Sequence, residues 1–401
     1  MSVASAFLAM GLDARAPVLP PVDPGAALRG PPIEAWSRPL PGRPPNSASR
    51  AEPASPVVWG NFLLVGGSGV DAVLVLDRRD GALRYELPTG APVACAPVVA
   101  DGVAYVSDSA GYTSAFRLAA LDVGKPMWKH FGGAPILSSP TLSDGVLYVT
   151  NVNDEVVALD AAKGELRWRY AHELDPARGA SLELYGAPSA AVDRRRGELL
   201  VGFSDGFVVA LRVSDGEPRW NASIGEGTYP DLIAPAQPVG DMVIVGGYSE
   251  PLLALDPEER SVRWRVEIGS AAPFTLEGVD GGAVALFHGG TDGRLRRIDP
   301  RTGEVVWVWS SGDDGTLTRP VPTERGLLVG SSDGSLHLVD PATGAGRWSF
   351  EPGIQLEGFS AAPVLDGNTI YAVSNAGRVY ALEGFAPGPR ARARDPWVST
   401  R

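Results

Sequence analysis

The sequence is poor in cysteine and histidine, the two side chains that most often build reactive or metal centres. It holds one cysteine, Cys95, in 401 residues, which excludes an internal disulfide and any zinc site made of several cysteines. Cys95 lies in the apolar run APVACAPVV, so we expect a small buried residue. The histidines lie far apart and without metal-ligand spacing, at His130, His172, His288 and His337. We therefore expect no metal centre.

Common catalytic motifs and a basic surface are also missing. The chain has no phosphate-binding loop and no dinucleotide fingerprint. Lys and Arg number 35 against 47 Asp and Glu, and a net charge of −12 repels phosphate backbones, which excludes nucleic acid as a partner. No apolar run approaches the ~20 residues that cross a bilayer as a helix. The sequence thus predicts neither catalytic residues nor a cofactor.

Glycine and tryptophan, by contrast, are abundant and recur together. A Gly-x-x-x-Trp feature is found at Trp128, Trp168, Trp220, Trp307 and Trp348. Trp264 keeps a preceding Asp but lacks the Gly, and Tyr85 takes the place of Trp in an earlier copy. From Trp128 to Trp348 the intervals are 40, 52, 44, 43 and 41 residues. A period of this length indicates a repeat architecture.

Each repeat predicts four short antiparallel strands. A run opened by Pro is followed by a second strand such as DGVLYVTN, a third such as EVVALD, and the Trp strand. Asp and Gly between the third and fourth strands suit a tight turn, with Gly in a left-handed conformation. The Trp offers a flat apolar face to the next repeat, so we assign it a structural role. Four strands per unit favour a β-propeller over a β-helix, whose coils are shorter.

The ring is expected to have eight blades and to be closed by an N-terminal strand. Seven full units end at Trp348, and an eighth begins at Ser360 and supplies three strands through Leu382. The stretch PIEAWSRPL, with Trp36, precedes the first unit and has no parent unit there. We expect it to complete the last blade, which leaves no open edge in the ring. The rival is a seven-bladed ring with separate terminal strands.

Two tails flank the predicted propeller of residues 33–386. Residues 1–32 are rich in Pro, Ala and Gly and are expected to form a flexible tether, or to include a degraded export signal. Residues 387–401 carry several arginines and are expected to be a disordered basic tail. Such a tail is either solvated or touches an anionic membrane surface.

The repeat unit, APVVADGVAYVSD followed by VVALDAAKGELRWRY, resembles the repeat named for pyrroloquinoline-quinone (PQQ) proteins. Two families with this repeat are similar to the chain. Quinoprotein dehydrogenases are eight-bladed enzymes that cap their quinone with a disulfide between adjacent cysteines, which a single cysteine cannot form. The BamB-type outer-membrane assembly factor is an eight-bladed scaffold without catalysis, and this resemblance covers about residues 33–386.

The BamB resemblance implies a partner-binding loop in the longest interval, between Trp168 and Trp220. The sequence SLELYG there resembles a Leu-x-Leu-Arg-Gly stretch of that family, with Tyr185 in the place of the Arg. In the family this loop binds a periplasmic POTRA domain of the barrel subunit, BamA, helped by acidic residues that open the next blade. The implied partner-binding residues here are Leu182, Leu184, Tyr185 and Asp231. Apolar side chains in a loop that the propeller does not need suit an interface. The alternative is that Leu182 and Leu184 begin blade four and pack inward.

The resemblance therefore implies a non-enzymatic scaffold that assists the insertion of β-barrel proteins into the outer membrane. Its partners would be the POTRA domains of a BamA-like subunit, and the chain would act as a monomer within a complex. The expected location is the periplasm, peripheral to the outer membrane, although the lipid-bearing cysteine of the family has no counterpart near the N-terminus. The alternative function is an oxidoreductase or sensor that binds PQQ in the central channel.

Overall fold

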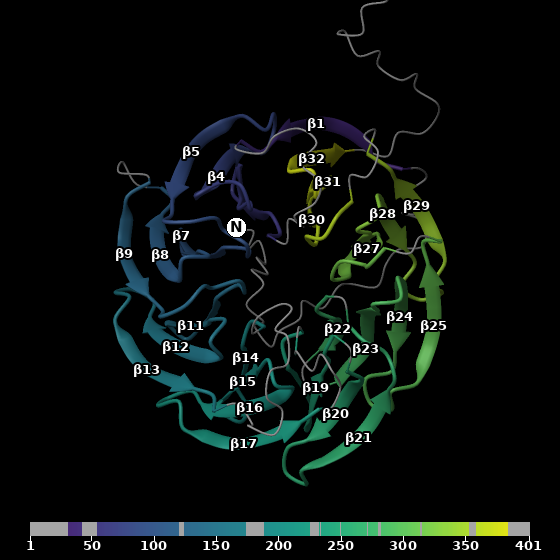
Figure 1. The fold of residues 1–401 in the computed structure, drawn as a ribbon. Helices are drawn as coiled ribbons and strands as arrows, with labels where there is room; N and C mark the ends of the chain where they lie inside the picture. The colour runs from purple at the N-terminus through teal and green to yellow at the C-terminus, as the bar shows by residue number, and fades with distance from the viewer. Residues whose placement is uncertain are drawn as a thin grey trace, which may run out of the picture.

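The computed structural model describes residues 31–41, 54–119, 124–173, 188–224, 232, 234–248, 250–270, 272–279, 282–312, 315–352 and 358–383. Within these ranges the regular structure is entirely β. Eight four-stranded antiparallel sheets form a ring of blades (Figure 1). This confirms the predicted eight-bladed propeller, and the seven-bladed rival is wrong.

Seven blades are each built from four consecutive strands. Within a blade the first strand lies nearest the centre of the ring and the fourth lies at the rim (Figure 1). Blade one consists of β2 (Val57–Trp59), β3 (Phe62–Val65), β4 (Ala72–Asp77) and β5 (Leu83–Pro88). Blade two consists of β6 (Val98–Ala100), β7 (Val103–Ser107), β8 (Tyr112–Arg117) and β9 (Pro126–Phe131). Blade three consists of β10 (Thr141–Ser143), β11 (Val146–Thr150), β12 (Glu155–Asp160) and β13 (Leu166–Ala171). Blade four consists of β14 (Ala191–Asp193), β15 (Glu198–Gly202), β16 (Phe207–Arg212) and β17 (Pro218–Ser223). Blade five consists of β18 (Gln237–Val239), β19 (Met242–Val245), β20 (Leu252–Asp256) and β21 (Ser261–Val266). Blade six consists of β22 (Thr275–Val279), β23 (Gly282–Gly289), β24 (Arg294–Ile298) and β25 (Val305–Ser310). Blade seven consists of β26 (Val321–Thr323), β27 (Gly326–Gly330), β28 (Leu336–Val339) and β29 (Gly346–Phe350).

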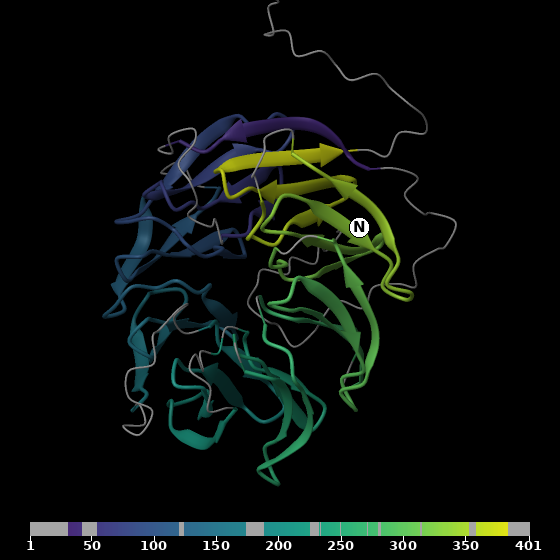
Figure 2. The same cartoon turned by 45° about the vertical axis from the view of Figure 1, so that its right-hand side comes forward.

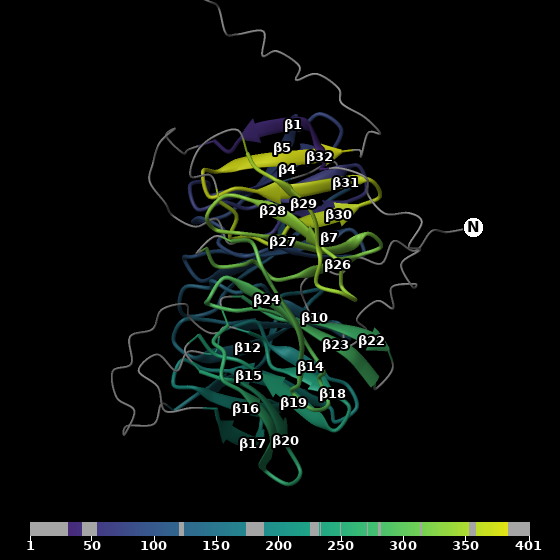
Figure 3. The same ribbon diagram turned by 90° about the vertical axis from the view of Figure 1, so that its right-hand side faces the viewer.

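Blade eight combines the two ends of the described chain. It consists of β30 (Val364–Asp366), β31 (Thr369–Val373), β32 (Arg378–Glu383) and the N-terminal strand β1 (Ile33–Pro39). β1 pairs antiparallel with β32, with Trp36 opposite Ala381. Figures 2 and 3 show β1 lying along the outer side of β32. The prediction that the Trp36 strand closes the ring is confirmed.

The hydrophobic core lies between the blades. One cluster joins blades two and three, for example, through Val98 and Tyr105 on one side and Leu147 and Val157 on the other, all buried. Both faces of each sheet are covered by neighbouring blades, which explains why the second and third strands are apolar along almost their whole length. Cys95 is buried as expected, with 3% of its surface exposed.

A contact between Trp and Gly fastens neighbouring blades. A Cβ built on Gly164, which has φ of 71°, would lie 2.5 Å from the ring of Trp128 in the preceding blade. The indole Nε1 of Trp128 donates to the carbonyl of Ala161 in the same turn at 3.0 Å. The equivalent pairs are Trp36 on Gly81, Trp168 on Gly216, Trp264 on Gly303 and Trp307 on Gly344. Gly is therefore needed twice over at these positions, for its left-handed backbone and for its missing side chain.

The ring has two distinct faces because the strands of each blade alternate in direction. One face carries the turns between the first and second strands and between the third and fourth strands, and is called the turn face below. The opposite face carries the turns between the second and third strands and the links from blade to blade, and is called the connection face. The long interval between Trp168 and Trp220 contains a link on the connection face, between β13 and β14.

Candidate functional site

The predicted partner-binding residues fall in two links that flank blade four. Leu182, Leu184 and Tyr185 precede β14, and Asp231 precedes β18. All four lie outside the described residues, so their contacts stay predictions. The alternative, that Leu182 and Leu184 begin blade four and pack inward, concerns the same residues and stays open; the described part of β14 begins at Ala191.

The residues on which these two links end lie close together. Pro188 follows the first predicted segment, and Leu232 follows the second. A Cβ built on Gly202, at the end of β15, would lie 2.7 Å from Leu232 Cβ and 3.1 Å from Pro188 Cγ. Leu232 is 1% exposed and forms an isolated antiparallel bridge with Gly247. The described residues next to the two segments, Pro188 and Leu232, thus lie a few ångströms apart on blade four.

A buried polar cluster fixes the base of the first segment. Ser204 donates to Asp154 twice, from its backbone N to Oδ1 at 3.1 Å and from Oγ to Oδ2 at 2.5 Å. His172 Nε2 lies 2.9 Å from Asp205 Oδ2, and the His172 ring stacks on Phe203 with centroids 4.2 Å apart. Asp154 belongs to blade three and Ser204 to blade four, so these contacts clamp the junction beneath the link.

Contacts from blade three hold the described residues on both sides of the link. The backbone N of His172 donates to the carbonyl of Asp154 at 3.0 Å. On the other side, Thr150 Oγ1 donates to the carbonyl of Pro188 at 2.8 Å. Burial raises the pKa of Asp154, with the nearby Asp205 acting in the same direction, while the bonds from Ser204 oppose the shift. The arrangement is that of a rigid support for a loop.

This cluster does not have the geometry of a nucleophilic centre. The Ser204 hydroxyl donates to the Asp154 carboxylate, and His172 contacts Asp205 and not Ser204, so the cluster lacks the serine–histidine hydrogen bond of a nucleophilic triad. Among the described residues, no group of three or more His, Cys, Asp or Glu is placed to hold a metal ion. The four histidines lie in four different blades, in β9, after β13, in β23 and in β28.

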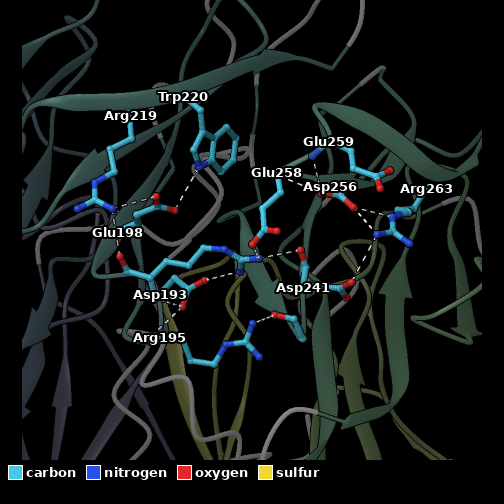
Figure 4. A network of polar contacts seen from close by, with 12 residues as sticks. Asp193, Arg195, Glu198, Arg219, Trp220, Asp241, Asp256, Glu258, Glu259 and Arg263 are labelled. Carbon is cyan, nitrogen blue, oxygen red and sulfur yellow. Dashed lines mark hydrogen bonds and ion pairs between the residues drawn. The ribbon is translucent and has the colours of Figure 1, made fainter.

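The turn face beneath blades four and five departs from the regular repeat. Arg260, with φ of 53°, takes the position that Gly164 holds in blade three. Trp220 consequently has no glycine to cover, and its Nε1 donates to Glu198 Oε2 of its own blade at 3.1 Å (Figure 4). The Trp–Gly contact is therefore lost at the junction of blades four and five.

A network of arginines joins the two blades instead (Figure 4). Arg196 donates to the carbonyl of Asp241 at 3.0 Å and pairs with Asp193 of its own turn at 3.1 Å. Within blade five, Arg263 donates to Asp256 from Nε at 2.8 Å and lies 3.5 Å from Asp241 Oδ2, so it supports the turn that Arg196 contacts. These contacts are polar and partly exposed to solvent. Salt should therefore weaken this junction more than the junctions that a tryptophan fills.

Sequence reasoning missed both features, although the signals were present. The lost Gly at Arg260 was visible in the repeat, but its consequence for Trp220 depends on the adjacent blade. Asp154 and Asp205 occupy neighbouring turns of successive repeats, and His172 opens the longest interval. The residues in contact are 33 to 50 positions apart, so their contacts follow only from the packing of one blade against the next.

No helix among the described residues is long and apolar enough to cross a membrane.

Comparison with known proteins places this geometry in a family. The family model described as outer membrane protein assembly factor BamB matches residues 34–123, 112–279 and 291–391. The BamB of Yersinia pestis is 30% identical over 240 residues, which cover 57% of this chain and 57% of that protein. The BamB of Burkholderia pseudomallei strain K96243 is 25% identical over 345 residues, 83% of this chain and 84% of that protein. The chain thus spans little more than half the length of the Yersinia relative and most of the Burkholderia one.

Solved structures share the fold. The crystal structure of BamB from Moraxella catarrhalis aligns with a TM-score of 0.69 at 18% identity, over 88% of this chain and 100% of that one. Quinohemoprotein alcohol dehydrogenase from Comamonas testosteroni aligns with a TM-score of 0.67 at 16% identity, over 89% of this chain and 77% of that one. Both likenesses concern the eight-bladed ring. Because the family model matches most of its length, the chain belongs to the family of the outer membrane protein assembly factor BamB.

Proposed function

We propose that the protein is a non-enzymatic scaffold that assists the assembly and insertion of β-barrel proteins into the outer membrane. It acts from the periplasm, peripheral to that membrane, as a monomer within a complex. Membership of the BamB family and the names of its relatives support this role. The single observation that carries it is that Pro188 and Leu232, the described residues next to the two segments, lie together at Gly202, beside the buried His172 cluster.

The partner in this proposal is a POTRA domain of a BamA-like barrel subunit. Leu182, Leu184 and Tyr185 supply apolar anchors from the first link, and Asp231 supplies a charge from the second. Apolar and aromatic anchors ringed by polar groups carry most of the affinity of protein interfaces. The described ends of the links favour this arrangement, because Leu232 is buried beside Pro188 and directly follows Asp231.

The mechanism is the rigid presentation of these links. Fixing both ends of a loop lowers the conformational entropy that it loses on binding, so more of the contact energy appears as affinity. The contacts of Asp154 and Thr150 with the two ends of the first link fix it in this way. The ring itself supplies stiffness, since each blade is buried against two neighbours.

The test is capture of the full chain by immobilised tandem POTRA domains of the cognate barrel subunit. Leu184→Asp places a charge in the proposed interface and should weaken binding by about tenfold or more, as loss of an interface anchor does. Leu166→Asp is the matched control, since Leu166 is 51% exposed on the outer strand β13 of blade three. Loss of capture in Leu184→Asp alone supports the interface. Failure of the wild type to bind would refute the partner, and equal loss in both variants would refute the site.

The alternative, a PQQ-binding oxidoreductase or sensor, has the shared fold in its favour. The residues present do not fit the disulfide cap of those enzymes, because Cys95 is the single cysteine and its Sγ donates to the carbonyl of Ser107 at 3.7 Å. Calorimetric titration with PQQ and Ca²⁺ decides the matter. Tight, calcium-dependent binding would overturn the scaffold proposal.

A further inference from the structure

Among the described residues, no strand pairs with the outward edge of the outer strand of any blade, at the rim of the ring (Figure 1). Such edges attract other strands, and proteins usually protect them with charged residues or proline. Seven of the eight outer strands follow this rule. The protecting residues are Glu34, Arg38 and Pro39 in β1, Arg84, Glu86 and Pro88 in β5, Pro126 and Lys129 in β9, Arg167 and Arg169 in β13, Pro218 and Arg219 in β17, Arg263 and Arg265 in β21, and Arg347 in β29.

The outer strand of blade six lacks this protection. β25 has the sequence VVWVWS, without a charge or a proline. In β13, Arg167 precedes the Trp at a bulge and pairs with the turn residue Asp160 at 2.8 Å. Val306 takes the same bulge position in β25, and the turn residue Asp299 pairs instead with Arg301 at 2.8 Å. Blade six therefore keeps the bulge but exchanges the protecting arginine for an apolar side chain.

Exposed apolar side chains gather on β25. Val305 is 38% exposed, and Val306 and Val308 are each 51% exposed. The two tryptophans of the strand point the other way, into the junction with blade seven. Trp307 donates to the carbonyl of Pro341 at 3.1 Å, and the Trp309 ring lies 5.0 Å from that of His337. One edge of β25 pairs with β24, and no strand of the described part of the chain pairs with its other edge, which the valines flank on the rim.

We propose that the edge of β25 binds an extended, uncharged polypeptide segment by strand addition, pairing with the residues after the bulge. Backbone hydrogen bonds would supply the affinity, and alternate side chains would supply the selectivity. The segment must be uncharged because β25 offers no group to pair with a charge, and burying an unpaired charge against Val306 and Val308 is costly. Apolar side chains at alternate positions fit the exposed valines as cross-strand neighbours.

The source to which we commit is a membrane strand of an unfolded β-barrel client, a choice that rests on the proposed function. Strands that cross the outer membrane alternate apolar and polar residues over about ten positions. A ring that holds the assembly subunit on its connection face would in this way hold a client strand on its rim. The two surfaces are separate, because blade six is not among the blades that flank the predicted links.

The experiment uses fluorescence anisotropy with a labelled, end-capped ten-residue peptide in which Val alternates with Thr. The full chain should bind this peptide, and the double variant Val306→Arg/Val308→Arg should lose about tenfold or more in affinity. This variant restores the Arg-Trp-Arg pattern of β13 and β21. Asp299 can pair with a second arginine besides Arg301, as Asp77 pairs with both Arg79 and Arg84, so the variant should remain folded. A peptide N-methylated at alternate residues should not bind, since it cannot complete the backbone pairing.

The reverse exchange is the matched control. Arg167→Val/Arg169→Val removes the protection from β13 and should create a second peptide site of similar affinity. Equal binding by the wild type and the Val306→Arg/Val308→Arg variant would overturn the proposal, as would equal binding of the N-methylated peptide. Dimers of the wild type that the arginine variant abolishes, without peptide binding, would overturn it in favour of a second copy of the chain. Loss of POTRA capture with intact peptide binding would refute the scaffold partner and not this edge.

Discussion

Substituting Ala for Gly164 tests whether the repeat needs glycine for more than its backbone. Gly164 and Gly145 both lie in turns of blade three, with φ of 71° and 74°. A Cβ on Gly145 meets nothing within 4 Å, whereas a Cβ on Gly164 meets the Trp128 ring at 2.5 Å. The two substitutions therefore share one conformational cost and differ in one steric clash.

The expected magnitudes follow from that difference. A left-handed Ala costs about 1 kcal/mol, which is the whole effect expected for Gly145→Ala. Gly164→Ala must also push the Trp128 ring away from its seat, and forcing extra atoms into a packed site adds about 2 kcal/mol. We therefore expect the free energy of unfolding to fall by about 3 kcal/mol in Gly164→Ala.

Urea unfolding followed by circular dichroism measures both variants under the same conditions. Adding Trp128→Leu to each should shrink the gap between them, because the smaller side chain leaves room for the methyl group. Equal destabilisation by Gly164→Ala and Gly145→Ala would refute the reasoning. So would a gap that persists in the Trp128→Leu background.

Three further predictions concern single residues. Arg260→Gly should raise the free energy of unfolding by about 1 kcal/mol by relieving a left-handed arginine, and an unchanged urea midpoint would contradict that strain. Burial raises the pKa of Cys95 to about 12, so Ellman's reagent at pH 8 should react only in denaturant, and rapid labelling of the native chain would contradict it. Burial lowers the pKa of His288 to about 3, so the unfolded chain binds the extra proton between that value and about 6.5, and stability should be lost as the pH falls through this window. His288→Gln should reduce the slope of the free energy of unfolding against pH by about 1.4 kcal/mol per pH unit between pH 4 and 6. Urea unfolding of both proteins measures this slope, and equal slopes would refute the assignment.

The repeat made the fold predictable from sequence. Apolar alternation, Asp-Gly turns and the Trp period each indicate the same four-stranded unit, and the unpaired Trp36 strand at one end matched the incomplete unit at the other. The repeat period does not predict which residues of two neighbouring units contact each other. Gly164 was expected to matter for its turn, and its second role, as the seat for Trp128, depends on the distance between blades.

The candidate site was less accessible to sequence reasoning. The length of the interval between Trp168 and Trp220 located an insertion, and its apolar residues suggested an interface. The support beneath it involves side chains from separate repeats, such as His172 and Asp205, whose partnership no local pattern encodes. Likewise, the exchange of a tryptophan contact for an arginine network at Trp220 follows from packing across a junction.

The pairing of β1 with β32 also bears on how the protein is made. Trp36 and Ala381 are 345 positions apart, so the eighth blade cannot exist until nearly the whole chain has left the ribosome. At ordinary rates of synthesis this takes roughly 20–80 s, during which the nascent N-terminal strand has no partner. Blades one to seven contain only local pairings and can form in order, so ring closure is the slow, late step of folding. A chaperone that delays or protects this one strand would therefore control how quickly the ring is completed.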